Sequence, residues 1–278
     1  WRLSQLIMGV ADPVERITTI PPSGLPLVRQ LEAIGARSWP ANSTRFDGAW
    51  ATRLTASHPS KRLNCVTPLD RVDLGDTDKR MAVIERRFES FGRPLTFRLS
   101  PLASPELERR LDAEGWRIFD TTDVMMMNLA QADLSAAMPQ VPLADGGKWI
   151  DQSIAMGGID RAIKPGVAEL LARIRGQYGL FLTEGADGTP LAAALAVRLG
   201  ALVGIFQMLS NPAARRAGHA RQILRSALLW GQQMGASRAW LQVTVENDAA
   251  QALYRSSGFH PVYRYDYRQK PDVGNGHD

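Results

Sequence analysis

At 278 residues the chain is long for one compact domain and fits two domains of about 130 residues each. Apolar residues make up 45% of it and charged residues 22%, which excludes the composition of a disordered protein. The formal charge of +5 favours anionic partners, and the single cysteine, Cys65, excludes an intramolecular disulfide and favours a reducing, cytoplasmic location.

The first half of the chain predicts an arm followed by helices and strands. Residues 1–24 contain the turn-forming run from Ile20 to Gly24 and are expected to form an N-terminal arm. The elements expected within residues 25–130 are a helix at 25–36, strands at 44–55 and 62–69, a helix at 76–91, a strand at 95–99, a helix at 105–114 and a strand through 125–129. The helix at 105–114 is signalled by Ser104 as its cap and Pro105 at its first position.

The second half predicts a further set of helices and strands after a linker. Residues 131–145 contain Pro139 and Pro142, show little periodicity and are expected to separate two domains, 25–130 and 146–270. Residues 271–278 are expected to form a flexible tail. The elements expected within 146–270 are helices at 148–156 and 165–174, strands at 178–184, 191–198 and 201–209, a helix at 218–234, a strand at 237–245, a helix at 248–256 and a strand at 262–268.

The two halves resemble each other in their last third. A strand, a helix opened by Ser104 and the pair Gly115-Trp116 return 143 residues later as a strand, a helix opened by Asn247 and the pair Gly258-Phe259. An internal repeat of this size indicates a duplicated domain. Chance and the shared strand-helix-strand order are the alternative explanation.

Arginine is concentrated in the second half. Between Thr189 and Val245 there is no Asp or Glu, while six arginines fall inside this stretch. Such a field attracts phosphates, although a solvated basic face is the simpler interpretation of the arginines alone. Nucleic acid is not expected as a partner, because the sequence carries no helix-turn-helix or RNP-like signature.

A short glycine-containing run lies between a strand and the amphipathic helix at 218–234. Residues 215–220 read RRAGHA, with Gly218 at the start of the helix. Glycine lets a ligand approach the backbone closely, and the first amide groups of a helix point outward at the positive end of its dipole. The run is therefore a candidate pyrophosphate site, although simple packing of a small residue is the commoner cause of this pattern.

A second motif begins 27 residues after His219. Residues 246–259 read ENDAAQALYRSSGF. Together, the two motifs resemble those of the GNAT acetyltransferases, in which an R/Q-x-x-G-x-G/A loop is followed by N-x-x-A-x-x-L-Y-x-x-x-G-F. The resemblance covers about 125 residues and implies an α/β (α+β) fold of two tandem GNAT-like domains, each with a mixed, mostly antiparallel sheet flanked by helices.

The resemblance also implies a reaction and a site. It implies an N-acetyltransferase that uses acetyl-CoA as co-substrate, with no metal, and an amine-bearing small molecule or peptide as acceptor. Tyr254 would protonate the leaving thiolate, and the backbone N–H near Met208 would stabilise the oxyanion. The implied acetyl-CoA contacts are Met208, Ser210, Arg215, Arg216, Ala217, Gly218, His219, Ala220, Arg221 and Asn247.

The sequence lacks the usual carboxylate for the general base. Many relatives place Glu on the central strand where this chain has Gln207. Glu246, an ordered water chain or a residue of the first half is the expected substitute. The rival interpretation is a CoA-binding sensor or scaffold protein without turnover, which the absent carboxylate favours and Tyr254 disfavours.

The first half departs from the motif. The loop before its helix at 76–91 lacks the glycine motif and contains Asp70 and Asp73, while Asp76 and Asp78 open the helix. Four carboxylates would repel a pyrophosphate. Since Leu111 stands opposite Tyr254 at the 143-residue offset, the first half is expected to bind no CoA and to shape the acceptor site through residues such as Arg45, Trp50, Arg62 and Asn64.

No membrane partner or metal site is expected. No apolar run approaches the roughly 20 residues of a membrane span, and the N-terminus lacks the order of a signal peptide. The His and Cys residues show no zinc-type spacing.

Overall fold

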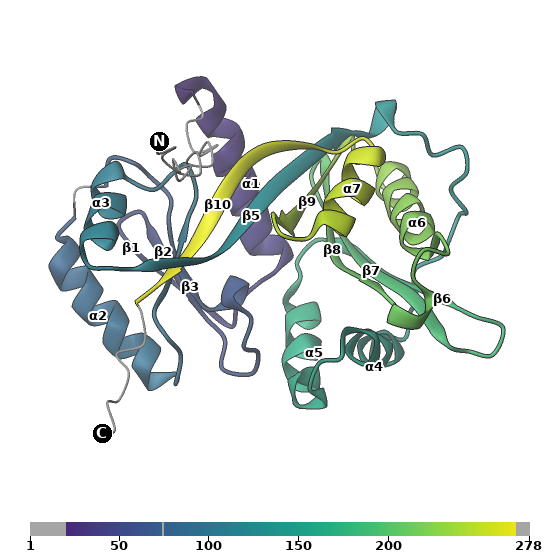
Figure 1. The fold of residues 1–278 in the computed structure, drawn as a ribbon, viewed down its shortest axis with the longest axis horizontal. Coiled ribbons are helices and arrows are strands. Elements are labelled where there is room, and N and C mark those ends of the chain that lie inside the picture. The colour runs from purple at the N-terminus through teal and green to yellow at the C-terminus, as the bar shows by residue number, and fades with distance from the viewer. Residues whose placement is uncertain (1–20, 74, 271–278) are drawn as a thin grey trace, which may run out of the picture.

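The computed structural model describes residues 21–73 and 75–270 (Figure 1). Most of the expected arm and the whole expected tail lie outside these ranges. The first half contains α1 Leu25–Ser38, β1 Ser43–Asp47, β2 Trp50–Leu54, β3 Cys65–Pro68, α2 Thr77–Ser90, β4 Thr96–Leu99, α3 Pro105–Ala113 and β5 Arg117–Asn128. The second half contains α4 Gly146–Gly157, α5 Lys164–Arg173, β6 Gln177–Glu184, β7 Pro190–Leu199, β8 Leu202–Ser210, α6 His219–Gln233, β9 Arg238–Thr244, α7 Asp248–Ser256 and β10 His260–Gln269.

One expected strand is wrong. The sequence predicts a single strand at 44–55, whereas the chain folds back there as the hairpin of β1 and β2, with Asp47 opposite Trp50. The turn passes through Gly48, whose φ of +53° suits glycine. The pair Asp47-Gly48 is typical of a hairpin turn. The residues on both sides alternate between apolar and polar, so the whole segment has the pattern of one continuous strand.

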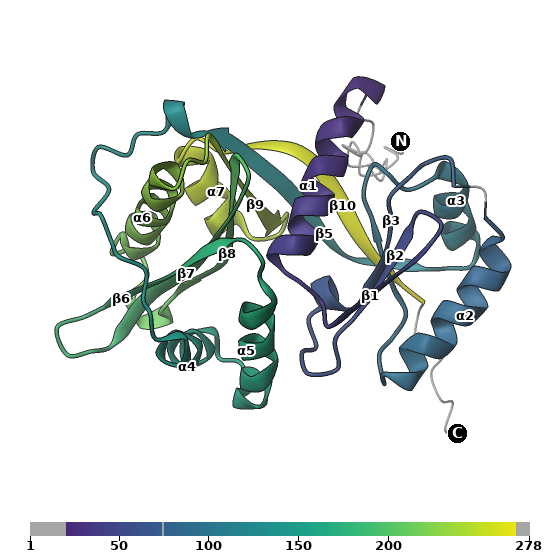
Figure 2. The same ribbon diagram turned by 180° about the vertical axis from the view of Figure 1, so that it is seen from behind.

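A single ten-stranded sheet runs through both halves of the molecule (Figures 1 and 2). Its strand order is β1-β2-β3-β4-β10-β5-β9-β8-β7-β6. Only the pairs β3–β4 and β8–β9 are parallel, and the other neighbours are antiparallel. The expectation of a mixed, mostly antiparallel sheet flanked by helices is confirmed.

The two halves exchange their last strands. β5 ends the first half but pairs with β9 of the second, while β10 is the last described strand of the second half and pairs with β4 of the first. The exchanged strands also pair with each other over most of their lengths. Each half therefore completes its part of the sheet with a strand from the other.

Corresponding elements recur at the spacing that the sequence suggests. α3 and α7 have nine residues each, and they are opened by Ser104 and Asn247, whose side chains accept hydrogen bonds from the amides of Leu107 and Ala250. Both helices end before a glycine with positive φ, Gly115 and Gly258. This agreement is what an internal repeat predicts.

Helices cover both faces of the second half of the sheet. Alternate residues of β7 enter different cores, because successive side chains of a strand point to opposite faces. Ala192, Ala194 and Ala196 pack with α6 and α7, whereas Ala193, Leu195 and Val197 pack with α1, α4 and α5. A separate core lies between the first-half strands and α2 and α3.

Candidate active site

β8 carries a bulge beside the place where it separates from β9. The parallel pairing of these strands ends at Ile205 opposite Leu241. On its other edge, β8 places two residues, Gln207 and Met208, opposite the single Ala194 of β7. Gln207 has a positive φ of 47°, so the backbone turns sharply at the bulge. Within the described part of the chain, the rest of β8 has a strand partner on one side only, which leaves backbone groups directed into the opening between the strands.

The amino end of α6 is open to a ligand. Gly218 is the residue before the helix, with a φ of +84°, and no side chain caps the first turn. Arg216 also has a positive φ, of 63°. A Cβ added at Gly218 would meet nothing within 4 Å. The first amide groups of this fifteen-residue helix are thus accessible, with the positive end of the helix dipole behind them.

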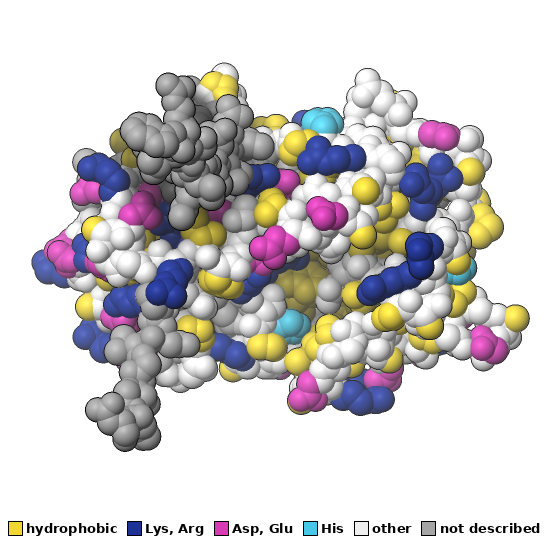
Figure 3. All heavy atoms as spheres, viewed as in Figure 1, with side chains coloured by type: hydrophobic (Ala, Val, Ile, Leu, Met, Phe, Trp, Pro, Cys, Tyr) yellow, Lys and Arg dark blue, Asp and Glu magenta, His cyan; other side chains and the backbone are white. Residues whose placement is uncertain are grey.

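Positive side chains surround this helix end. Arg215 and Arg216 are exposed, and the Nη2 atom of Arg221 donates a hydrogen bond to Ser256 Oγ at 3.0 Å. Figure 3 shows Lys and Arg side chains over the lobe that contains α6 and α7. The backbone donors, the open space at Gly218 and the charge fit a phosphate-bearing ligand such as coenzyme A.

Tyr254 lies on α7 at the edge of the second-half core. Its side chain is only 7% exposed and its ring packs against Phe259, with 6.0 Å between the ring centroids. Burial raises the pKa of Tyr254 to about 12, because the phenolate would lose hydration. The phenol is therefore protonated at neutral pH, as a proton donor has to be.

Asn247 and Glu246 lie in the turn between β9 and α7. The Asn247 Oδ1 atom accepts a hydrogen bond from the amide of Ala250 at 3.1 Å and caps α7. Its side-chain NH2 group is left to donate to a ligand. Glu246 is exposed and is not among the residues that line the cavities of about 620 Å³ and 390 Å³, so its role as a base stays a prediction.

A cavity of about 390 Å³, here called the junction cavity, lies where the halves meet. Figure 3 shows a hollow between the two lobes with a largely hydrophobic floor. Its polar lining from the second half includes Gln207, Gln242, Thr244, Tyr265 and Tyr267, and that from the first half includes His58, Lys61 and Arg62. The bulge of β8 therefore faces a chamber that both halves build.

A second cavity of about 620 Å³, here called the inner cavity, lies between α1 and the first-half strands. It shares Arg62 and Gln242 with the junction cavity, so the two chambers adjoin. Its lining also includes Arg53, Arg98 and Glu32. No local sequence pattern points to these residues, because their contacts depend on α1 and the exchanged strand β10.

Of the first-half residues considered from the sequence, only Arg62 lines either cavity. Arg45 is exposed on β1, and Trp50 is buried against Phe97. The Asn64 side chain is buried and accepts a hydrogen bond from the amide of Thr55 at 2.8 Å. These three residues therefore hold the first half together or face solvent.

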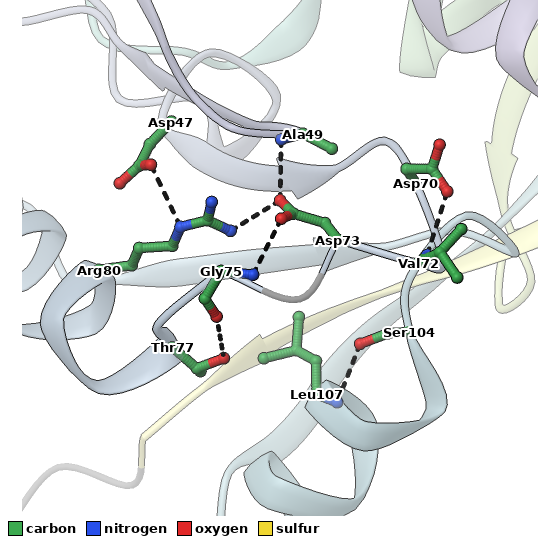
Figure 4. A network of polar contacts seen from close by, with 10 residues as sticks. All are labelled: Asp47, Ala49, Asp70, Val72, Asp73, Gly75, Thr77, Arg80, Ser104 and Leu107. Atoms are coloured by element: carbon green, nitrogen blue, oxygen red, sulfur yellow. Dashed lines mark hydrogen bonds and ion pairs between the residues drawn. The ribbon is translucent and has the colours of Figure 1, made fainter.

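The first-half loop before α2 is filled by its own side chains (Figure 4). Asp73 accepts hydrogen bonds from the amides of Ala49 and Gly75 and pairs with Arg80, with 2.7 Å between Oδ2 and Nη1. The hydrogen bond from Arg80 is the main cause that lowers the pKa of Asp73. Asp76 caps α2 by accepting from the amide of Lys79. A Cβ added at Gly75 would lie 2.1 Å from the Arg80 guanidinium, so no open space corresponds to that at Gly218.

No helix within residues 21–73 and 75–270 combines the length and the apolar character that crossing a membrane requires.

Comparison with known proteins places this site in a family. The chain is 24% identical over 251 residues to an uncharacterized N-acetyltransferase, YobR, of Bacillus subtilis strain 168, covering 87% of this chain and 98% of the relative. The fold is similar to that of a GCN5-related N-acetyltransferase from Kribbella flavida, with a TM-score of 0.64, 18% identity and coverage of 88% and 95% of the two chains. It is also similar to a tandem GNAT protein from the clavulanic acid biosynthesis pathway, with a TM-score of 0.60, 12% identity and coverage of 86% of each chain.

The match extends to a family defined over nearly the whole chain. Residues 27–268 match the family described as "Probable histone acetyltransferase Rv0428c C-terminal". That range includes both motifs, both cavities and the exchanged strands. The chain therefore belongs to this acetyltransferase family and, with it, to the GNAT superfamily of N-acetyltransferases, and it is an acyltransferase enzyme.

Proposed function

We propose that the protein transfers the acetyl group of acetyl-CoA to a primary amine by direct attack of the amine on the thioester. GNAT acetyltransferases in general use acetyl-CoA. The observation that carries the proposal for this chain is the open amino end of α6, where Gly218 leaves space and unbonded amides beside exposed arginines.

The proposed binding mode uses backbone groups more than side chains. The amides from Arg216 to Arg221 hold the pyrophosphate, while Met208 and Ser210 on the open edge of β8 pair with the pantetheine arm like an added strand. The side-chain NH2 group of Asn247 donates to the same arm. When bound, acetyl-CoA supplies the activated acyl group and a thiol leaving group.

The transfer balances without a metal or redox step. The amine nitrogen bonds to the acyl carbon, the carbon–sulfur bond breaks, the sulfur takes a proton and the nitrogen gives one up. Tyr254 is the proposed proton donor to the sulfur, and the backbone N–H at the β8 bulge, near Met208, is the proposed oxyanion donor.

Removal of the amine proton is assigned to water or to Glu246. None of the described residues that line the junction cavity is Asp or Glu, and Gln207 occupies the bulge. Glu246 does not line this cavity, so an amine bound there would pass its proton to Glu246 only through water molecules. The amine then has to lose its proton largely to solvent.

We further propose that the halves arose by duplication and that the first half has lost CoA binding. The support is the 143-residue correspondence of α3 with α7 and the Arg80 side chain that fills the space at Gly75. The division into units 25–130 and 146–270 belongs to this proposal. The free, buried Cys65 supports a reducing, cytoplasmic setting, again as a proposal.

Thiol release in the presence of acetyl-CoA and a panel of small amines and peptide N-termini tests the function. Acceptor-dependent CoA release is expected. Acetyl-CoA binding by calorimetry without release for any amine would instead favour a sensor or scaffold protein, the rival that the missing carboxylate supports. Absence of acetyl-CoA binding would contradict both.

A further inference from the structure

The inner and junction cavities have a strong excess of positive charge. Among the described residues that line them, there are six Lys or Arg side chains and one carboxylate, Glu32. Glu32 is already engaged, because it pairs with Arg98 and its Oε1 atom accepts a hydrogen bond from Tyr263 Oη at 2.6 Å. Among the other five cations, Arg29 and Lys61 pair with Asp70 and Asp120 outside the lining, which leaves Arg37, Arg53 and Arg62 without a carboxylate partner among the described residues.

Arg53 is a buried guanidinium without an anion. Its side chain comes from β2 and the residue is 6% exposed. It donates to the backbone oxygen of Trp39, while its Nε atom is buried and has no partner. Burial is the main cause that lowers the pKa of Arg53, and the charges of Arg98 and Arg62 act in the same direction. A negative charge at this point would relieve both effects.

Arg62 connects this position to the junction cavity. It lines both cavities, and its Nε atom is also buried without a partner. No ion pair to Arg53 or Arg62 forms with any residue whose position is described. Two guanidinium groups thus face adjoining chambers with unused hydrogen-bond capacity, which is costly unless a ligand supplies the acceptor.

Two neutral hydrogen-bond donors in the junction cavity also lack an acceptor. His58 Nδ1 accepts a hydrogen bond from the amide of Ser60 at 3.1 Å, which places the proton of the neutral ring on Nε2. Burial, and then the charge of Arg93, lower the pKa of His58 and keep it neutral. Both His58 Nε2 and the hydroxyl of Tyr267 are buried without partners, and both residues line the junction cavity.

We propose that the acceptor is an amine that also carries a carboxylate, and that Arg53 and Arg62 bind this carboxylate while the amine lies beside Gln207 at the opening between β8 and β9. This inference rests on the proposed acetyl transfer and names the substrate class for it. The first half of the protein then supplies the specificity-determining residues and the second half supplies the transfer machinery. A paired guanidinium site suits a carboxylate, because its planar donors match the two oxygens.

The kinetic test compares amines that differ only in charge. A series of linear ω-amino carboxylates of increasing length is assayed beside the corresponding ω-amino amides by CoA thiol release. At the best length, the carboxylate is expected to have kcat/KM about tenfold or more above the amide, as expected for losing a charged hydrogen bond. Equal kcat/KM for carboxylate and amide at every length would overturn the inference.

The matched variants are Arg62→Met and Arg45→Met. Arg62→Met is expected to lower kcat/KM for the carboxylate by about tenfold or more and thereby to remove its advantage over the amide, and the KM for acetyl-CoA is measured beside it as a check on the cofactor site. Arg45→Met, on an exposed arginine that lines neither cavity, is expected to leave the preference intact. Loss of activity on carboxylate and amide alike in folded Arg62→Met would contradict a role in charge recognition.

A binding measurement separates this inference from the proposed function. Hexanoate is expected to raise the melting temperature of the ligand-free protein, hexanamide is not, and Arg53→Lys is expected to weaken the hexanoate effect. Failure of acetyl-CoA to bind would sink the proposed function while hexanoate binding still stood. Normal amine acetylation with no difference between hexanoate and hexanamide would sink the inference alone.

Discussion

Two glycines separated by 143 residues, each close to the start of a helix, have different surroundings in this molecule. Gly218 precedes α6 and has open space around it, with no side chain on the first amides. Gly75 precedes α2 and has the Arg80 guanidinium in the same relative space, while Asp76 caps the helix. A related part of the backbone is left open in one half and is occupied by the chain's own side chains in the other.

The difference teaches that a helix end becomes a binding site only when the chain leaves it unsatisfied. Every helix start has orphan amides, and most are bonded by a capping side chain. In the first half Asp76 does this, while Asp73 accepts from the loop amide of Gly75 and Arg80 neutralises the charge of Asp73. Repulsion of a pyrophosphate by carboxylates is thus only part of the reason to expect no binding there, because the space itself is filled.

The largest expected effect comes from filling the open site. Gly218→Glu places a carboxylate where the phosphate belongs and forces a side chain into a left-handed backbone position, so no acetyl-CoA binding is expected by calorimetry. Gly75→Ala is the matched control. It displaces Arg80 and is expected to lower the free energy of unfolding by about 1 kcal/mol, with unchanged acetyl-CoA affinity. Normal affinity in Gly218→Glu would contradict the site.

The next effect concerns Tyr254, the proposed proton donor, which has Leu111 as its counterpart in the first half at the 143-residue offset. Tyr254→Phe is expected to lower kcat about 100-fold, while the Kd for acetyl-CoA changes by less than about threefold. The proposed role of the phenol is to protonate the sulfur as the thioester breaks, which does not contribute to the binding of intact acetyl-CoA. Stopped-flow or steady-state thiol release gives kcat, and calorimetry gives Kd. Equal losses in the two quantities would mean that Tyr254 only supports the binding site.

The pH profile sharpens the same assignment. Since burial raises the pKa of Tyr254 to about 12, its proton is present throughout an assay from pH 6 to 10. For a primary alkyl amine, whose ordinary pKa is about 10.4, kcat/KM is expected to keep rising up to about pH 10 with no falling limb. A falling limb with a midpoint near pH 8 would show that another group is the acid.

A smaller effect, on the free energy of unfolding, is expected from removing the Asp73 and Arg80 side chains that fill the loop before α2. Arg80→Ala leaves Asp73 without its cation in a position where both side chains are 12% exposed, and a loss of about 2 kcal/mol in unfolding free energy is expected from chemical denaturation. The double variant Asp73→Ala/Arg80→Ala removes the charge and the filling together. It is expected to gain no acetyl-CoA binding, because Asp76 still caps α2. Binding gained in the double variant would make Arg80 and Asp73 the only barrier.

The smallest expected effects are at the two equivalent caps. Ser104→Ala and Asn247→Ala each remove one hydrogen bond to a helix amide, and a loss of about 1 kcal/mol in unfolding free energy is expected for each. Asn247→Ala alone is expected to weaken acetyl-CoA binding as well. If both variants behave alike in calorimetry, the role of Asn247 is limited to the cap.

The elements and their order were largely accessible from the sequence, because periodicity and caps are local signals. α3 is an example, since Ser104 and Gly115 mark its two ends. The hairpin at Gly48 was missed, because a short turn within alternating residues keeps the strand pattern. The exchange of β5 and β10 was not predictable, since strand pairing over long separations leaves no mark in the local pattern.

The candidate site divides in the same way. The cofactor contacts and Tyr254 were named from motifs of contiguous residues, and they remain predictions for ligand-binding experiments. On the acceptor side the sequence singled out Arg62 but not His58, Arg53 and Gln242, because these three residues come from strands or loops that only the folded sheet brings together. The alternating Tyr263, Tyr265 and Tyr267 were the available signal, since period-two aromatics mark a buried strand face.

The strand exchange limits when the first half can finish folding during protein synthesis. The side chain of Gln269 donates a hydrogen bond to Thr96, 173 residues earlier, so the sheet of the first half lacks a strand until β10 has left the ribosome. Until then the nascent first half has an unpaired strand edge at β4, which exposes it to aggregation. Maturation of the enzyme is thereby tied to completion of its last ten-residue strand.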